Sequence, residues 1–266
     1  MEMVKENRDI FRERNRSWML AAAAVVGLFI ASSVITEFDG IAGLTAIPKV
    51  IIWMAENLVP DAKAMTRLPK ILKRLWETSM LSISVTMAAA VCAFFFALLG
   101  SNITRMNGIV KKIVRTIAAF FRNVPDVVWA ILLMFSFGQN ILTGFFALFF
   151  TTFGLLTRAF IETIDEVSAS CVEALAATGA SYMQTIFQGV VPSAVSGLMT
   201  WILYMIETNI RSSTLIGMLT ATGIGYTFDL YYKRLEYPTA SLVVLTIVVL
   251  VIAIELLSNK IRKVIL

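Results

Sequence analysis

Six long apolar runs constrain this chain more than any other feature of its sequence. They cover residues 18–35, 78–99, 117–137, 141–160, 194–219 and 239–257. A helix needs about 20 apolar residues to cross the hydrocarbon core of a bilayer, and these runs approach or exceed that length. Composition agrees, because 58% of the residues are hydrophobic and 15% are charged, whereas about a quarter are charged in a typical soluble domain. The sequence therefore predicts an all-α, polytopic transmembrane protein with about six spans.

Charged residues between the runs orient the spans. Residues 1–17 are rich in both signs of charge, and the run after them is too long and lacks a convincing cleavage site for a signal peptide. Cytoplasmic loops carry an excess of Lys and Arg. Lys111, Lys112 and Arg115 follow the second run, and further basic residues follow the sixth. We therefore expect both termini to be cytoplasmic.

The first 75 residues are organised differently from the rest. Residues 41–59 are apolar but interrupted by Pro48 and charged residues, and residues 62–76 alternate basic with apolar side chains. The second pattern predicts an amphipathic helix lying along the membrane interface, on the outer side in this topology. We expect two regions. Residues 1–75 would hold the cytoplasmic N-terminus, the first span and this amphipathic outer segment, and residues 76–266 the main transmembrane domain.

Several function classes are disfavoured. The chain has no His, which removes the commonest general base and metal ligand, and it has no P-loop motif for ATP. We expect no catalytic residue, no metal and no cofactor. The net charge of +5 is explained by orientation and contact with membrane lipid, so no nucleic-acid partner is expected. A stand-alone secondary transporter or a membrane enzyme stays as an alternative with little support.

A short polar segment, EALAATGASYMQTIFQGVVP, separates two apolar runs. Its Glu173, Ala174, Gly179 and Pro192 match the EAA loop of permease subunits of ATP-driven (ABC) importers, in type and spacing. Leu175, Gly189 and Val191 depart from that pattern, at positions where it has Ala, Ile and Leu. The resemblance implies a coupling loop near residues 162–192 that docks on a separate ATPase.

An ordinary helix–turn–helix loop is the alternative for this segment. Gly179 would end one helix and Pro192 would stand in the first turn of the next. The preceding residues 161–171 carry three acids and no basic residue, which is unusual for a cytoplasmic loop. That acidity favours a surface covered by a protein partner.

Charged and polar residues interrupt the fifth apolar run. The segment IETNIRSST places Glu207 four residues before Arg211, the spacing of an ion pair on one helix face. Charges within the bilayer are costly and mark partners or water-filled paths. Two interpretations stay open and are compatible: a structural Glu–Arg pair, or an anion path. The candidate path residues are Glu207, Asn209, Arg211, Ser212, Ser213, Thr214 and, from the segment RNVPD, Arg122.

The order of these segments resembles the permease subunits of phosphonate importers, the PhnE family. Arg122, Pro125 and Asp126 match its R-x-x-P-D motif, and the segment around Asn209 matches its E-x-N-x-R-S-A-T motif, with Ser213 in place of Ala. Thr220 and Thr222 replace glycines of its Gly-rich segment.

This resemblance implies a type I importer permease with the MetI-like fold in the bacterial inner membrane. It also implies a homodimer with two ATP-binding cassette ATPase subunits and an extracytoplasmic phosphonate-type substrate-binding protein. Phosphite, phosphate or another small solute stays open as the substrate.

Overall fold

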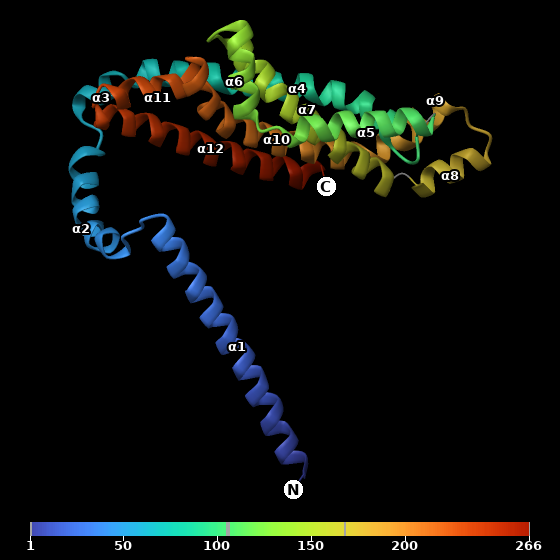
Figure 1. Ribbon diagram of the computed structural model, residues 1–266. Coiled ribbons are helices and arrows are strands. Elements are labelled where there is room, and N and C mark those ends of the chain that lie inside the picture. Colours follow the sequence, from blue (N-terminus) through green and yellow to red (C-terminus); the bar gives the residue numbers. More distant parts are fainter. Residues whose placement is uncertain (1, 105–106, 168, 266) are drawn as a thin grey trace. The chain divides into compact units, whose positions relative to one another are not determined.

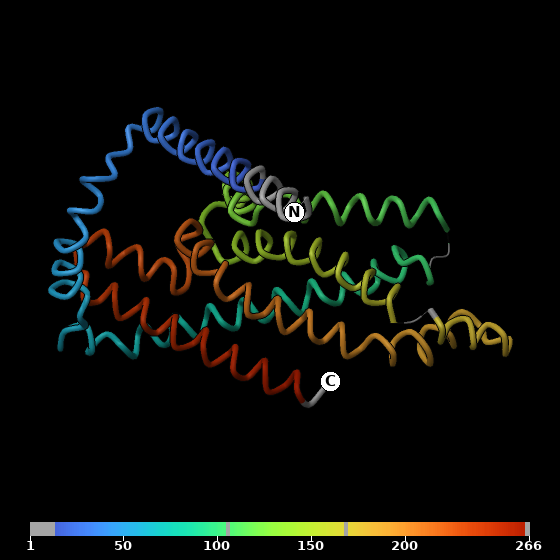
Figure 2. The backbone as a smooth tube through the Cα atoms, turned by 90° about the horizontal axis from the view of Figure 1, so that it is seen from below, coloured from blue at the N-terminus to red at the C-terminus, as the bar shows by residue number. Residues whose placement is uncertain are grey.

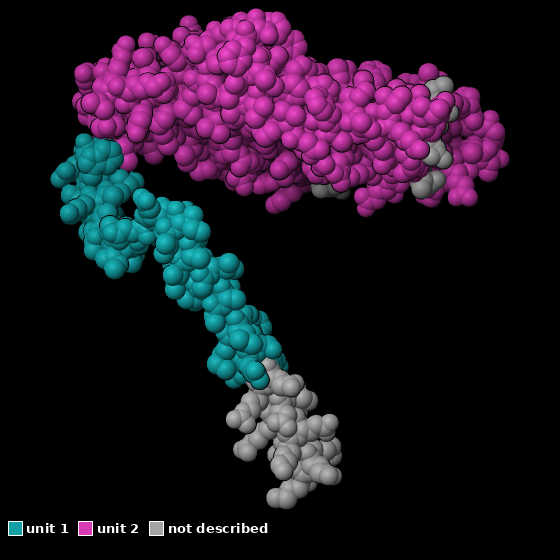
Figure 3. Space-filling model, viewed as in Figure 1, with its two compact units in different colours: residues 1–57 teal, residues 58–266 magenta. Residues whose placement is uncertain are grey.

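The computed structural model describes residues 2–104, 107–167 and 169–265, and every element within those ranges is a helix (Figure 1). Side chains are described for residues 14–104, 107–167 and 170–263, so those of the charged residues 1–13 lie outside the description. The chain divides into two compact units, residues 1–57 and 58–266 (Figure 3). Each unit is considered by itself.

The first unit contains α1 (Glu2–Ile35) and α2 (Gly40–Asn57). The segment Arg14–Ile35 of α1 is long and apolar enough to span a membrane, and its side chains are not buried by the protein. The first expected span is therefore a helix whose apolar surface lipid can cover. α2 continues through Pro48 and also has no buried residue, so the interruption in the sequence at this proline does not end the helix.

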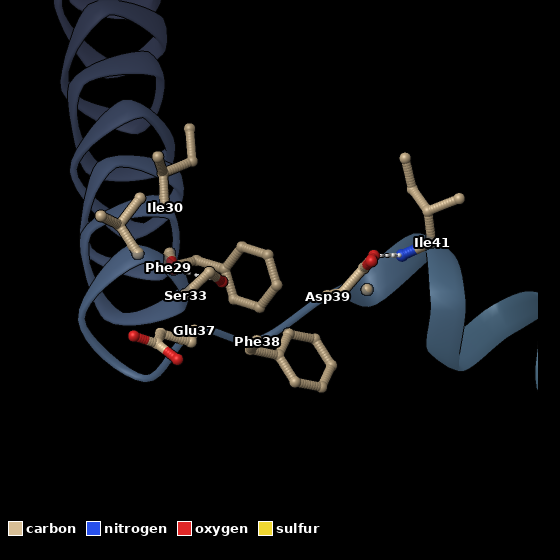
Figure 4. A pocket seen from close by; sticks show the side chains of 9 residues that line it. Phe29, Ile30, Ser33, Glu37, Phe38, Asp39 and Ile41 are labelled. Atoms are coloured by element: carbon tan, nitrogen blue, oxygen red, sulfur yellow. Dashed lines mark hydrogen bonds between the residues drawn. The ribbon is translucent and has the colours of Figure 1, made fainter.

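A short turn joins α1 to α2. Glu37 has a left-handed φ of 52°, which ends α1, and Asp39 Oδ1 accepts a hydrogen bond of 3.0 Å from the backbone N–H of Ile41 at the start of α2 (Figure 4). A hollow of about 560 Å³ lies at this turn, with Phe29 and Phe38 among the residues that line it (Figure 4).

The second unit contains the remaining helices. They are α3 (Ala62–Thr66), α4 (Leu68–Gly100), α5 (Gly108–Asn123), α6 (Asp126–Phe137), α7 (Ile141–Val167), α8 (Ala169–Ala177), α9 (Tyr182–Gln184), the π-helix η1 (Thr185–Val190), α10 (Val191–Thr220), α11 (Gly223–Lys233) and α12 (Tyr237–Ile265). In both views α4, α7, α10 and α12 run along a common direction (Figures 1 and 2). α8 and α9 lie at one end of this bundle, and α3 lies at the other (Figure 1).

The amphipathic helix expected over residues 62–76 is not a separate element, which corrects that prediction. α3 ends at Thr66, and the backbone N–H of Arg67 donates to the carbonyls of its last turn. Residues 68–76 form the first turns of the 33-residue α4. Ile71 and Leu75 are buried, against α11 and α12, so this apolar face is covered by protein rather than by the membrane interface.

The third expected span, residues 117–137, is broken. α5 and α6 meet at an angle of 88°, and Figure 1 shows α6 turned out of the line of α5. Pro125 explains the break, because proline disfavours a helical conformation in the residue before it, and Val124 is extended. With this pair counted as one span, up to six candidate spans are present, and the all-α prediction of about six spans is confirmed.

The core of the second unit forms around α7, which packs against α4, α5, α6 and α10. On α4 the buried positions facing this core are alanines, among them Ala89, Ala93 and Ala97, which leave room for Phe160 of α7. Gly154 of α7 allows still closer contact with α5, since a Cβ there would lie 2.6 Å from the backbone nitrogen of Arg122. Small residues at such points let membrane helices approach closely.

Candidate functional site

The first part of the EALAATGASYMQTIFQGVVP segment folds as the end of α8 and the short helix α9, joined by a capped turn. α8 ends in a Schellman motif: Gly179 has a φ of 78°, its N–H donates to Ala176, and the N–H of Ala180 donates to Leu175. Ser181 then forms a capping box with Gln184. Pro192 stands in the first turn of α10. The turn roles expected for Gly179 and Pro192 are therefore present.

Two departures from the EAA pattern contact each other across this turn. α8 packs on η1, and a Cβ added to Gly189 would lie 2.7 Å from Cδ1 of Leu175 and 3.3 Å from Sγ of Cys171. The pattern has a small residue at the position of Leu175 and a large one at the position of Gly189. At Leu175 a large side chain replaces a small one, and at Gly189 a small residue replaces a large one. The two changes face each other, so the summed side-chain volume of the contact changes little.

The outer face of α8 is open. Glu173 and Ala174 are exposed, as are Ala176 and Ala177. Only the face with Cys171, Val172 and Leu175 is half-buried. The helix therefore presents a surface of small residues and one carboxylate at one end of the bundle (Figure 1).

Hydrogen bonds tie this end of the bundle together. Asp165, near the end of α7, accepts from Ser101 Oγ (2.5 Å), from the backbone N–H of Asn102 (2.7 Å) and from Arg115 Nη2 (3.0 Å). The hydroxyl of Tyr182 on α9 donates to the carbonyl oxygen of Thr104 (2.8 Å). α9 is thus bonded directly to the loop that follows α4.

Two of the three acids in residues 161–171 have partners inside the chain. Asp165 lies in the network above, and Glu162 Oε1 accepts from Arg158 Nε at 2.6 Å. The acidity of this stretch is therefore balanced by arginines of α5 and α7, which weakens the argument that it indicates a protein partner.

The polar residues of α10 fall into two groups, and Asn209 belongs to the inner one. It is 3% exposed, its amide donates to Thr86 Oγ1 (2.8 Å) and its Oδ1 accepts from Thr152 Oγ1 (3.1 Å). Ser213 accepts from Ser82 Oγ at 3.1 Å. Asn209 thus joins α10 to both α4 and α7, and Ser213 joins it to α4, a packing role that was not predicted for either residue.

Arg211 belongs to the outer group. Its guanidinium forms an ion pair with Glu207 on the same helix, and the side chains are 53% and 13% exposed respectively. The expected same-face pair is present, with the cation as the open partner. Ser212 is half-buried, and Thr214 Oγ1 donates to the carbonyl of Ile210 at 3.4 Å. The structure thus does not bring the expected path residues to one surface.

A stripe along α10 continues the surface of Arg211. Trp201, Tyr204, Thr208, Arg211 and Leu215 recur at alternating spacings of three and four, and each is exposed or half-exposed. Side chains at this spacing share one helix face. This stripe brings an arginine and several polar groups to one open surface in the middle of the 30-residue α10.

Arg122 lines a cavity between α5, α7 and α10 that Arg211 does not line. The cavity has a volume of about 330 Å³, and Arg122 shares it with Arg158 and with Tyr204 and Thr208 of the α10 stripe. Arg158 was not among the site residues predicted from the sequence. A signal was present, since Arg158 is a charge inside an expected span, and such charges are rare.

A helical bundle with apolar spans, an exposed short helix at one end and an arginine-bearing stripe along α10 is typical of a membrane transport subunit. Comparison with known proteins gives the family. Residues 89–265 match the model of the binding-protein-dependent transport system inner membrane component. The chain belongs to this family, and the expected resemblance to PhnE-type ABC permeases is confirmed. It is a transport subunit of an inner-membrane transport system rather than an enzyme.

Three relatives are permeases named for the transport of phosphate, phosphite or phosphonate. The phosphate-import permease protein PhnE of Mycolicibacterium smegmatis is 30% identical over 190 residues, which is 71% of this chain and 36% of the relative. The chain thus spans about a third of that relative's length. The phosphite transport system permease protein PtxC of Stutzerimonas stutzeri is 26% identical over 245 residues, 92% of this chain and 85% of the relative. An Escherichia coli K12 relative, 33% identical over 117 residues (44% of this chain, 96% of the relative), is named for a cryptic phosphonate transport system permease.

Solved structures show the same fold. A chain of the MetNI methionine ABC transporter in an inward-facing conformation gives a TM-score of 0.66 with 17% identity, covering 77% of this chain and 99% of that chain. A chain of an amino acid ABC transporter with histidines gives 0.65 with 15% identity, covering 77% and 99%. The expected MetI-like architecture is confirmed.

Proposed function

We propose that this chain forms the translocation path of an ATP-driven importer for a small phosphorus oxyanion, with phosphonate as the first candidate and phosphite or phosphate as the alternatives. The observation that carries the proposal is the open guanidinium of Arg211 on the α10 stripe. Arg211 lies within a candidate membrane span, nine residues before the end of α10, and charges within a span mark partners or water-filled paths. Its pairing with Glu207 leaves the guanidinium open to a further anion. The names of the relatives, for phosphate, phosphite and phosphonate transport, support the substrate class.

A second copy of the chain completes the path. The α10 stripe, from Trp201 to Leu215, combines large apolar side chains with Arg211 and is open in a single chain. A two-fold axis next to the stripe would bury the apolar residues and bring two Arg211 side chains to one path, because a symmetric dimer presents the same surface twice. The transport unit in this proposal is a homodimer, in which residues 76–266 of each copy form the path.

Glu207 sets how strongly the path holds an anion. An oxyanion that leaves water needs replacement donors, but a site that binds it too tightly will not release it. Each Arg211 is partly neutralised by the less exposed Glu207. The pair provides a guanidinium for recognition and a carboxylate that limits affinity.

Coupling to ATP takes place at α8. Its open face, with Glu173 and Ala174, supports docking in a groove of an ATPase subunit, one for each copy of the permease. Motion of the ATPases would reach the bundle through η1 and through the bond between Tyr182 and Thr104, and the path would then open alternately to each side. In this arrangement α8 and both termini are cytoplasmic. A phosphonate-type binding protein delivers substrate to the opposite end.

Uptake by proteoliposomes tests the role of Arg211. The complex of permease, ATPases and binding protein takes up labelled methylphosphonate in this proposal, and Arg211→Ala should abolish uptake while the complex still assembles. Arg74→Ala is a matched control, since Arg74 also pairs with an acid of its own helix (Glu77, 2.7 Å). If the double change Glu207→Ala/Arg211→Ala restores normal uptake, the pair is only structural and the path lies elsewhere.

A further inference from the structure

The cavity between α5, α7 and α10 contains two arginines whose hydrogen-bonding capacity is incompletely used. Arg122 Nε is buried and has no hydrogen-bond partner among the described residues. Arg158 pairs with Glu162 through Nε at 2.6 Å, and the Nη groups of the same guanidinium are further donors. Nε of Arg122 is enclosed by the protein, so an acceptor in the cavity would meet the Nη groups of Arg122 and Arg158, which both line it.

The backbone fixes the position of Arg122. It stands in the last turn of α5, and Gly154 of α7 lets the two backbones meet, since a Cβ at Gly154 would lie 2.6 Å from the Arg122 nitrogen and 2.8 Å from the Ala118 oxygen. The break after α5 begins directly beyond it. Arg122 therefore enters the cavity from a rigid helix end rather than from a mobile loop.

The chemistry of the cavity fits a small oxyanion. Its charged residues are Arg122, Arg158 and Glu162, which together give a net charge of +1. Guanidinium groups are planar forks that match phosphoryl oxygens. Tyr204 and Thr208 of α10 also line the cavity, but the Thr208 hydroxyl already donates to the carbonyl of Tyr204 at 2.9 Å, so the arginines are the main donors for an anion. The volume of about 330 Å³ is at the lower end of the range for small-molecule sites.

The position of the cavity along the helices bears on whether a solute or a lipid headgroup would occupy it. Thr208 is 17 residues from Val191 and 12 residues from Thr220 on α10, or about 26 Å and 18 Å along the helix at its rise of 1.5 Å per residue. Headgroups lie at the ends of a spanning helix, about 15 Å from the centre of the hydrocarbon core. Thr208 therefore lies well inside α10, whereas Glu162, which also lines the cavity, lies five residues before the end of α7, so the cavity extends inward from the end of that helix.

We propose that Arg122 and Arg158 form a binding site for a transported tetrahedral phosphorus oxyanion, one step along the path from Arg211. Thr208 connects the two positions, because it lines the cavity and precedes Arg211 by one turn on the α10 stripe. This inference rests on the proposed function and adds a second site, on the α8 side of Arg211. Glu162 limits its affinity, as Glu207 limits that of Arg211.

Direct binding tests the site. The permease–ATPase complex is placed in phosphatidylcholine nanodiscs without binding protein, and binding of radiolabelled methylphosphonate is measured by equilibrium dialysis. Arg122→Gln and Arg158→Gln should each weaken binding by about tenfold or more, since each removes a charge-assisted contact. Glu162→Gln should tighten binding, a gain that misfolding cannot produce. Arg74→Gln, at another paired arginine that lines a different cavity, should leave binding unchanged.

The outcomes separate this site from the proposed function. Unchanged methylphosphonate binding in the Arg122 and Arg158 variants, in a complex that still takes up methylphosphonate, overturns the site and leaves the function standing. Binding that falls in these variants, in a complex that transports no phosphorus oxyanion, supports the site and contradicts the function. Retention of added phosphatidylglycerol instead of methylphosphonate, lost in Arg158→Gln, would identify a lipid site and overturn the inference.

Discussion

Residue by residue, the polar side chains of α10 divide according to the face of the helix on which they lie. Asn209 is one residue from Thr208 and two from Arg211, yet it is buried between Thr86 and Thr152, whereas Arg211 is open. Sequence alone grouped these residues because they are neighbours in a polar segment. A helix turns about 100° per residue, so residues adjacent in the chain point to different surroundings. The sequence did not show which helices would pack on each face of α10.

Asn209→Ala should therefore reduce stability rather than transport. The change leaves the hydroxyls of Thr86 and Thr152 without their buried partner, and interhelical hydrogen bonds of this kind contribute about 0.6 kcal/mol on average and up to about 1.7 kcal/mol. Thermal unfolding of the purified permease should show a lower midpoint for Asn209→Ala and little change for the matched control Ser212→Ala. Uptake per folded molecule should stay near that of the unchanged protein. Normal stability with lost uptake would place Asn209 in the path instead.

At the level of helices and turns, features set by adjacent residues were predicted from the sequence, whereas contacts between distant residues were not. Gly179 and Pro192 were correctly placed because helix caps depend on a few adjacent residues. The break at Pro125 was missed, since the apolar run continues through it and suggests a single span. The contact of Leu175 with Gly189 was missed because it joins two helices across a turn, and in the sequence both residues were simply departures from the EAA pattern.

The exchange of volume between Leu175 and Gly189 can be tested by a double-mutant cycle. Gly189→Ile should displace α8, because even a Cβ there would lie 2.7 Å from Leu175, and Leu175→Ala should leave a void between α8 and η1. Each single change should lower substrate-stimulated ATPase activity of the assembled complex. The double change Leu175→Ala/Gly189→Ile, which restores the family pattern, should recover most of it. Strictly additive losses would show that the two residues act independently.

At the scale of the whole molecule, the fold class and spans were predictable because the bilayer imposes their length. The arrangement of the helices around α7 was not predictable. It depends on Gly154 and on the alanines of α4, and a small residue does not indicate which helix will pack against it. The same holds for the Arg122–Arg158 cavity, which brings together residues from α5, α7 and α10. In the proposed function, motion of the ATPases at α8 is converted into passage of an anion along α10.

ATP-dependent accumulation of methylphosphonate tests this account most directly. The full complex is reconstituted into proteoliposomes with ATP on the side of the ATPase subunits and with binding protein and labelled methylphosphonate on the other. The account predicts accumulation against a gradient that requires both ATP and the binding protein and that stops in Arg211→Ala. Passage of methylphosphonate that is independent of ATP, or driven by a proton gradient alone, would contradict it.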